Sequence, residues 1–304
     1  MNKSHIDLTS TERLGGSNEC PTHIPPSNYD SIDLYTDVRK RAVQDLVEQG
    51  RSIVTLGRRE TEAMKILYQE SERFFRLPFE AKASHQSSDF NFGYRPFGRQ
   101  YSVSPDKPDM NESFTFWRGD RNTVARNGRL NKFMSALEHY QRIVSQVSGA
   151  VLDALAEHFS TRNSVRFYRS SYIEINYYLP TAHRHLLQDR HEDGHLLTLL
   201  VTDGAGLEVE CDGVMTPVGL GANQLLIMPG SLLTALTGGL TPPLYHQVRN
   251  QHLAQRISMM YFVNPQADER INPYVQNDGN RELDIAALAR ANPLVFGLPE
   301  PPKD

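Results

Sequence analysis

The amino-acid sequence predicts an α+β protein with a mainly β core, either a β-sandwich or a jelly-roll barrel flanked by helices. The first part of the chain contains three segments with apolar residues at helical spacing. After residue 164 the chain becomes a series of short, β-rich segments separated by Gly, Pro or Asp. Many short strands that follow a helical part are typical of this architecture.

The helical part is expected to begin after a short strand at 32–34. Helices are expected at 37–49, 60–75 and 130–155, with a strand at 52–56 between the first two. Gly50 ends the first helix, and 90–115 is expected to be loop with short strands. The third helix carries a continuous apolar stripe, which indicates that it packs on a sheet.

Six segments of the second part are expected to be strands. They are SYIEINYYL at 171–179, HLLTLLV at 195–201, GLEVEC at 206–211, VMTPV at 214–218, QLLIMPG at 224–230 and RISMMYFV at 256–263. Cys211-Asp212-Gly213 has the composition of a hairpin turn.

The pattern shows no clean domain boundary. Residues 1–30 are polar and rich in Ser, Pro and Asn, which predicts an extended N-terminal arm. Residues 31–304 are expected to form a single domain: a mostly helical part at 31–163, a jelly-roll core at 164–270 and a C-terminal segment at 271–304.

The composition excludes several classes of protein. A net charge of -4 and a pI near 6.3 give no electrostatic support for binding nucleic acid. No apolar run approaches the length of a membrane span, and the first residues contain no secretory signal. The two cysteines, Cys20 and Cys211, indicate no disulfide framework. We therefore expect a cytoplasmic protein with a small-molecule partner.

The chemistry of the sequence concentrates in the second part. His191 and Asp193 are two residues apart, so on an extended strand they face the same side. His246 lies on another β-like segment, 53 residues after Asp193, and is the best third ligand. Two histidines and one carboxylate leave three positions of an octahedron open, which suits an iron(II) oxygenase. The pair alone is a weak signal, and His183, His185 and His195 lie in the same region.

The same residues offer a second interpretation. His191 to His195 match HExxH, the motif of zinc proteases. That motif requires a helix, whereas Gly194 and the following β-like LLTLLV favour a strand. On a strand four residues span about 13 Å, too far for two ligands of one metal.

Two further pairs predict a site for an anion. Arg256 and Ser258 share a strand face, and a guanidinium forms a bidentate pair with a carboxylate. Asn176 and Tyr178 share another face and offer hydrogen-bond donors. The ten residues from His246 to Arg256 suit two neighbouring antiparallel strands. The structural alternatives are a salt bridge from Arg256 to an internal carboxylate and simple packing of a Tyr-rich strand.

The order N-x-Y, H-x-D, distal H and R-x-S resembles the isopenicillin N synthase-like branch of the 2-oxoglutarate- and Fe(II)-dependent oxygenases. FFRLPFEAK at 74–82, GYRPFG at 93–98 followed by DMNESFTF, and GLEVECDGVMTPV also resemble segments of that family. The resemblance covers most of the chain. It implies a double-stranded β-helix, a distorted jelly roll, with flanking N-terminal helices.

The resemblance also implies roles for the site residues. His191, Asp193 and His246 would bind iron. Arg256 and Ser258 would bind the distal carboxylate of 2-oxoglutarate, assisted by Tyr178 and Asn176. The expected activity is O2-dependent hydroxylation, desaturation or cyclisation of a small molecule, with Fe(2+) and 2-oxoglutarate required.

Three departures from the family pattern bear on the substrate. LGRRE at 56–60 replaces the usual NHG, NYYLPTAHRHLL replaces NYYPxCP, and Gln247 replaces the arginine of HRV. They argue against a plant-hormone or flavonoid substrate and favour a different specialised pathway. Other interpretations are a cosubstrate-free oxidase such as isopenicillin N synthase, a zinc hydrolase, and a non-catalytic barrel that binds a small acid or a metal.

The candidates for substrate contact lie before the third helix. They are Arg95, Phe97, Arg99 and Tyr101 in the 93–101 loop, together with Phe114 and Phe116. The same residues could equally be surface charges and packing aromatics. Phe and Arg side chains together would suit an acidic, partly apolar small molecule.

Overall fold

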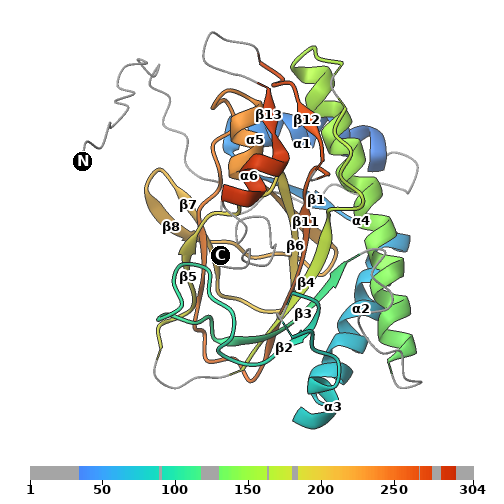
Figure 1. The fold of residues 1–304 in the computed structure, drawn as a ribbon, viewed down its shortest axis with the longest axis vertical. Coiled ribbons are helices and arrows are strands. Elements are labelled where there is room, and N and C mark those ends of the chain that lie inside the picture. The colour runs from blue at the N-terminus through green and yellow to red at the C-terminus, as the bar shows by residue number, and fades with distance from the viewer. Residues whose placement is uncertain are drawn as a thin grey trace.

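Two antiparallel sheets face each other, and helices cover the outer face of the larger one (Figure 1). The computed structural model describes residues 34–88, 91–117, 130–162, 164–179, 184–266, 268–275 and 282–291. The expected arm at 1–30 lies outside these ranges, as do residues 276–281 and 292–304 of the expected C-terminal segment. The mainly β core with flanking helices is confirmed.

The larger sheet has seven strands, all antiparallel to their neighbours. In spatial order they are β1 (Ser52–Thr55), β9 (Gln224–Pro229), β6 (Leu197–Thr202), β11 (Arg256–Val263), β4 (Tyr172–Tyr178), β3 (Asn111–Trp117) and β2 (Gly93–Arg95).

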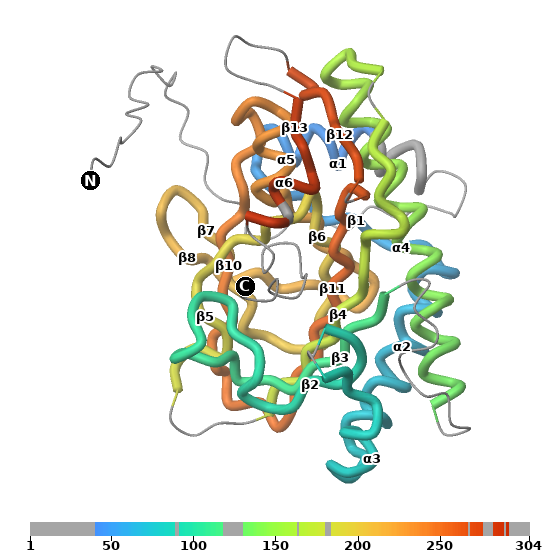
Figure 2. Tube along the Cα trace, in the orientation of Figure 1, coloured from blue at the N-terminus to red at the C-terminus, as the bar shows by residue number. Residues whose placement is uncertain are grey.

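The smaller sheet has four strands and lies opposite (Figure 2). Its order is β5 (Leu186–His191), β10 (His246–Arg249), β7 (Leu207–Cys211) and β8 (Val214–Pro217). A short pair, β12 (Arg270–Ile271) and β13 (Leu283–Asp284), lies apart from both sheets.

The helices belong mainly to the first part of the chain. They are α1 (Leu34–Gln49), α2 (Arg58–Phe75), α3 (Phe79–Ala83), α4 (Asn131–His158), α5 (Ser231–Leu236) and α6 (Ile285–Ala291). α2 and α4 run beside β3 and β4 in Figure 1. Among the described helices, no segment has the length and apolarity that a membrane crossing requires.

Alternation along the strands gives the larger sheet two different faces. Ile173, Ile175 and Tyr177 of β4 are buried in a core shared with the helices, whereas Tyr172 packs with Val209 in a second core between the sheets. Successive side chains of a strand point to opposite faces, so this difference defines an outer, helix-facing side and an inner side. The inner side of β4 therefore also carries Glu174, Asn176 and Tyr178.

The apolar stripe expected on the third helix is confirmed in α4. Phe133, Leu137, Val144, Val151 and Leu155 are all buried in the core between α4 and the larger sheet. The ring of Phe133 stacks on Phe74 of α2 at 5.0 Å. The helical part is thus fixed to the barrel wall by one continuous apolar layer.

The hairpin turn expected at Cys211-Asp212-Gly213 is confirmed. Asp212 and Gly213 have φ values of 50° and 79°, and they join β7 to β8 as the expected hairpin. The short strand expected at 32–34 is wrong at Leu34, where α1 begins, and residues 32 and 33 lie outside the described ranges. Single apolar residues before a helix do not distinguish a strand from the helix's first turn.

Candidate metal centre and active site

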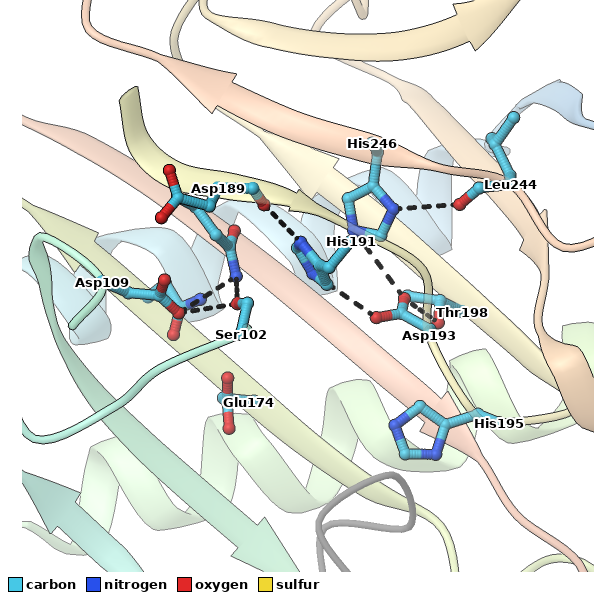
Figure 3. A network of polar contacts seen from close by, with 12 residues as sticks. Ser102, Asp109, Glu174, Asp189, His191, Asp193, His195, Thr198, Leu244 and His246 are labelled. Atoms are coloured by element: carbon cyan, nitrogen blue, oxygen red, sulfur yellow. Dashed lines mark hydrogen bonds and ion pairs between the residues drawn. The ribbon is translucent and has the colours of Figure 1, made fainter. Parts of the chain in front are cut away.

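Three potential metal ligands converge at one end of the smaller sheet. His191 ends β5, His246 begins β10, and the two residues are paired in register. Asp193 lies two residues beyond β5. Ligand atoms from the three side chains all lie within 4.8 Å of one another, and Figure 3 shows the side chains pointing toward a common point. Strand pairing therefore brings together residues that are far apart in sequence.

The backbone around Asp193 differs from the extended strand that we expected. β5 ends at His191, and a loop follows. Thr198 of β6 donates a hydrogen bond of 2.6 Å to Asp193 Oδ2, and the Ser231 amide donates one of 3.0 Å to the Asp193 carbonyl. Asp193 is consequently oriented by contacts from β6 and α5 and not by strand geometry.

Each histidine is held through the nitrogen that faces away from Asp193. Nδ1 of His191 lies 2.7 Å from the Asp189 carbonyl, and Nδ1 of His246 lies 3.2 Å from the Leu244 carbonyl. A carbonyl only accepts, so Nδ1 carries the proton in both rings. The Nε2 atoms lie 3.7 Å and 3.9 Å from the Asp193 carboxylate with their lone pairs available to a metal.

The surroundings of His191 and Asp193 favour the protonation states that a cation requires. Burial, and then His246, lower the pKa of His191 below its ordinary value. Burial alone would raise the pKa of Asp193, but His246, His191 and His195 together with the Thr198 hydroxyl hold that pKa below its usual value. Neutral imidazoles and an ionised carboxylate are the forms that bind a divalent metal. The donor set of two imidazoles and one carboxylate fits iron(II).

The HExxH interpretation fails on geometry. Residues 191–195 form the end of a strand and a loop, with no helical turn. His195 points elsewhere: its Nδ1 lies 2.8 Å from Asn264 Oδ1 and its Nε2 lies 3.5 Å from the Tyr172 hydroxyl. Of the other histidines considered, His185 is exposed and His183 lies outside the described residues.

Arg256 is buried at the start of β11, with 2% of its surface exposed. Its Nη1 donates a hydrogen bond of 2.6 Å to Ser258 Oγ, and its Nε contacts the carbonyls of Gly204 and Ala205. Its Nη2 has no hydrogen-bond partner, and no carboxylate among the described residues lies within 4 Å of the guanidinium. A buried guanidinium with an unused donor fits a carboxylate ligand, because an uncompensated buried charge is costly.

The second expected pair faces the first across adjacent strands. Asn176 is opposite Ser258 and Tyr178 is opposite Arg256 in the β4–β11 register. Asn176 Oδ1 also lacks a partner, and the Tyr178 hydroxyl donates a hydrogen bond of 2.9 Å to Gln188 Oε1. All four candidate 2-oxoglutarate residues thus lie on the inner face of the larger sheet. A pocket lined by residues including Tyr178, Leu187, Leu253 and Arg256 adjoins them.

The relation that we expected between His246 and Arg256 is wrong. β10 pairs with β5 and β7 in the smaller sheet, whereas β11 pairs with β4 and β6 in the larger sheet. The intervening residues carry the chain from one sheet to the other. The two residues therefore belong to different sheets, which face each other.

The expected substrate contacts divide into two groups. Arg95 is opposite Ser113 on the inner side of the sheet, and its Nη1 lies 3.6 Å from Glu174 Oε2. Phe114 and Phe116 are not brought to the site. They lie on the outer face of β3 in the helix-facing core, where Phe114 packs on Phe74 and Phe133.

The remaining loop candidates have no defined role at the site. Phe97 and Arg99 are exposed, and Tyr101 is half-buried.

Several polar residues at the site were missed from sequence. Ser102 and Gln188 form a network with the buried carboxylate of Asp109, which lies near His191 (Figure 3). Glu174 is buried between Tyr172 and Asn176 on the inner face of β4. The i, i+2 rule that selected Asn176 and Tyr178 would also have selected Glu174. No local pattern marks Ser102 or Asp109, which reach the site from a loop.

Comparisons with known proteins agree with this architecture. Residues 170–265 match the family model of the 2OG-Fe(II) oxygenase superfamily. Residues 40–133 match a second family model, described as "non-haem dioxygenase in morphine synthesis N-terminal". Gibberellin 2-beta-dioxygenase 7 of Arabidopsis thaliana is 22% identical over 77% of this chain and 72% of its own length. Oxoglutarate-dependent flavonoid 7-O-demethylase 1 of Ocimum basilicum is 26% identical over 70% of this chain and 60% of its own.

The structural comparison gives the same fold. The dioxygenase for auxin oxidation of rice superposes with a TM-score of 0.65 at 18% identity, covering 87% of this chain and 92% of that one. The fold is that of the non-haem oxygenases with a double-stranded β-helix. The chain belongs to the isopenicillin N synthase-like family of 2-oxoglutarate- and Fe(II)-dependent oxygenases. It is a dioxygenase that uses iron(II) and 2-oxoglutarate.

Proposed function

We propose that His191, Asp193 and His246 bind the iron, and that Arg256 and Ser258, assisted by Tyr178 and Asn176, bind the distal carboxylate of 2-oxoglutarate. The observation that carries this proposal is the opposition of the two groups across the barrel. The three metal-binding side chains converge within 4.8 Å at the smaller sheet. The buried guanidinium, with its unpartnered Nη2, belongs to the facing sheet.

Iron(II) with 2-oxoglutarate and O2 supplies the oxidation of a substrate C–H bond, coupled to formation of succinate and CO2. The chain supplies orientation and electrostatics. Asp189 and Leu244 fix the ring orientation of the two histidines, and Thr198 fixes the carboxylate between them. Arg256 sets the position of the cosubstrate through a charge-assisted contact in a site of low dielectric.

The organic substrate is a small molecule, which we assign to a specialised pathway. The similarity to enzymes of gibberellin and flavonoid metabolism supports this class, and the departures at 56–60 and at Gln247 separate this chain from their sequence pattern. The outcome is hydroxylation, desaturation or ring closure. A carboxylate at Asp193 leaves no vacancy for a halide, which disfavours halogenation. We assign residues 31–304 to one oxygenase domain that acts in the cytoplasm.

The test is release of succinate from 2-oxoglutarate by the iron-loaded enzyme. Asp193→Ala and Arg256→Ala should each abolish it, and Asp268→Ala, a matched change at an exposed position outside both sheets, should leave it unchanged. Normal turnover in Asp193→Ala would contradict the metal assignment. Oxygen uptake that does not depend on added 2-oxoglutarate would instead favour a cosubstrate-free oxidase.

A further inference from the structure

The inner face of β3 and β4 carries a row of polar side chains to which we have assigned no contact with iron or 2-oxoglutarate. Thr115 is directly opposite Glu174, and Ser113 is directly opposite Asn176. Side chains that are directly opposite on an antiparallel pair have Cβ atoms about 5 Å apart. Glu174, Thr115 and Ser113 consequently form one polar patch beside the residues assigned to 2-oxoglutarate.

The hydroxyls of this patch are buried without partners. Ser113 is 1% exposed and Thr115 is 3% exposed, yet neither hydroxyl oxygen has a hydrogen-bond partner in the part of the chain that the structure describes. Buried hydroxyls are normally satisfied, because a buried polar group without a hydrogen bond loses its hydration with no compensating contact. Two such groups side by side on the inner face are therefore well explained by a polar ligand.

Glu174 is the carboxyl member of the patch, and no hydrogen bond to its Oε2 is seen from the described residues. Gln100 donates a hydrogen bond of 2.6 Å to Oε1. Arg95 Nη1 lies 3.6 Å from Oε2, beyond hydrogen-bonding distance. A carboxylate accepts only, so the complementary group on a ligand is an N–H or O–H donor.

The charge balance of the interior opposes an acidic substrate. Arg95 faces Glu174, and Arg256 is assigned to 2-oxoglutarate. The acidic molecule that Arg95 suggested from sequence alone would place a second carboxylate beside Glu174, whose Oε2 lies 3.6 Å from Arg95 Nη1. Like charges brought together in a site of low dielectric repel strongly.

An aromatic surface adjoins the polar patch. Trp117 is opposite Tyr172, and their rings stack at 4.3 Å with an interplanar angle of 23°. The Phe262 ring lies 5.0 Å from that of Tyr172. These residues occupy the next inner-face position along β3, β4 and β11, beside Thr198, which holds Asp193. A ring packed there would lie between the polar patch and the metal ligands.

We propose that Glu174, with Thr115 and Ser113, selects a ring-containing substrate that presents an ammonium, amide or hydroxyl hydrogen to the Glu174 carboxylate, in preference to an acidic one. This inference rests on the proposed function, because it places the substrate beside the iron and 2-oxoglutarate assigned above. Glu174 is here a specificity-determining residue, and it selects the substrate without holding the metal or the cosubstrate.

Trp117 provides a direct readout, because it is the single tryptophan of the sequence. The enzyme is loaded with iron(II) and 2-oxoglutarate and kept anaerobic to prevent turnover. It is titrated with compounds of one or two fully saturated carbon rings, which do not absorb light at the wavelengths that excite tryptophan. Each ring is used in three matched forms: aminomethyl, hydroxymethyl and carboxylate. Dissociation constants are taken from the change in Trp117 fluorescence for the wild type, Glu174→Gln, Glu174→Ala and the exposed control Glu62→Gln on α2.

We expect the donor forms to bind at least about tenfold more tightly than the matched carboxylates, the size of a lost charged hydrogen bond. Glu174→Ala should remove this preference, Glu174→Gln should weaken the aminomethyl form more than the hydroxymethyl form, and Glu62→Gln should keep the wild-type order. Three results would overturn the inference. They are tighter binding of the carboxylates, a preference for donor forms that persists in Glu174→Ala, and no binding of any form. Affinity for 2-oxoglutarate, measured in the same preparations, checks folding of the variants. Its absence in the wild type would contradict the proposed function instead.

Discussion

The Thr198 hydroxyl donates a hydrogen bond of 2.6 Å to Asp193 Oδ2, the carboxylate oxygen that faces His246. This bond crosses from β6 to the loop after β5, and it fixes the one candidate ligand that no strand holds. Thr198→Val keeps the shape of the side chain and removes the donor. We expect a loss of metal affinity of about 10- to 100-fold, as is typical when a group that orients a ligand is removed.

That loss can be measured by calorimetric titration of the metal-free protein with iron(II) under anaerobic conditions. Thr216→Val on β8 is the control, since its hydroxyl contacts only a nearby carbonyl at the surface. Equal metal affinity in Thr198→Val and the wild type would show that Asp193 is oriented without this bond.

Arg256→Lys separates charge from geometry at the assigned 2-oxoglutarate site. Lysine keeps the positive charge but lacks the planar guanidinium. In the wild type, one nitrogen of that group, Nη1, contacts Ser258, and the other, Nη2, remains available for a ligand. We expect the KM for 2-oxoglutarate to rise at least about tenfold, with a smaller change in kcat at saturation. Steady-state succinate release at varied 2-oxoglutarate gives both constants. Arg270→Lys, at an exposed position, should behave as the wild type, and an unchanged KM in Arg256→Lys would remove Arg256 from the site.

Sequence periodicity predicted which site residues share a strand face, but it did not predict which strands pair with each other. The i, i+2 rule placed Asn176 with Tyr178 and Arg256 with Ser258, because a strand fixes which side chains share a face whatever it pairs with. It did not place β10 and β11 in different sheets. Both strands run antiparallel to their neighbours and present side chains to the interior, so their local patterns are the same in either sheet.

The face of β3 was also not predictable from its own residues. Aromatic Phe114 and Phe116 alternate with Ser113 and Thr115, and an apolar interior would have turned the phenylalanines inward. The barrel interior is polar near the site, and the apolar layer lies under α2 and α4. The helices therefore decide the orientation of β3, and that information is distant in sequence.

Gly230 is required where the chain turns behind the metal ligands. A Cβ built there would lie 2.1 Å from the His195 carbonyl oxygen and 2.6 Å from that of Asp193, and backbone atoms cannot move aside as a flexible side chain can. Gly230→Ala should therefore displace the Asp193 loop, lower the free energy of unfolding by about 1–3 kcal/mol or more, and weaken iron binding. Gly219→Ala is the matched control, because nothing lies within 4 Å of the added atom. Denaturant unfolding and metal titration together check the prediction, which a stable Gly230→Ala variant with normal iron affinity would refute.

Glu208 makes a pH-dependent contribution to the stability of the β7–β10 pair. It is opposite Gln247 in the β7–β10 pair, and it accepts hydrogen bonds from Gln247 Nε2 at 2.6 Å and from Arg249 Nε at 2.5 Å. Partial burial would raise the pKa of Glu208, but these two partners hold that pKa below its ordinary value of 4.5. The departure at Gln247 thus places a neutral donor on a carboxylate that also binds Arg249, next to His246.

The sign of the pH effect follows from this depression. A carboxylate with a lower pKa in the folded state stabilises the fold above the unfolded pKa, and the contribution is lost as the pH falls through the folded pKa. Glu208→Gln should therefore lower the free energy of unfolding by a constant amount at about pH 6 to 8, and the difference from the wild type should shrink as the pH falls below 4.5. Urea unfolding of both proteins across this range measures the difference. A gap that stays constant down to about pH 3, or that widens on acidification, would show that the Glu208 carboxylate does not stabilise β10 through its charge.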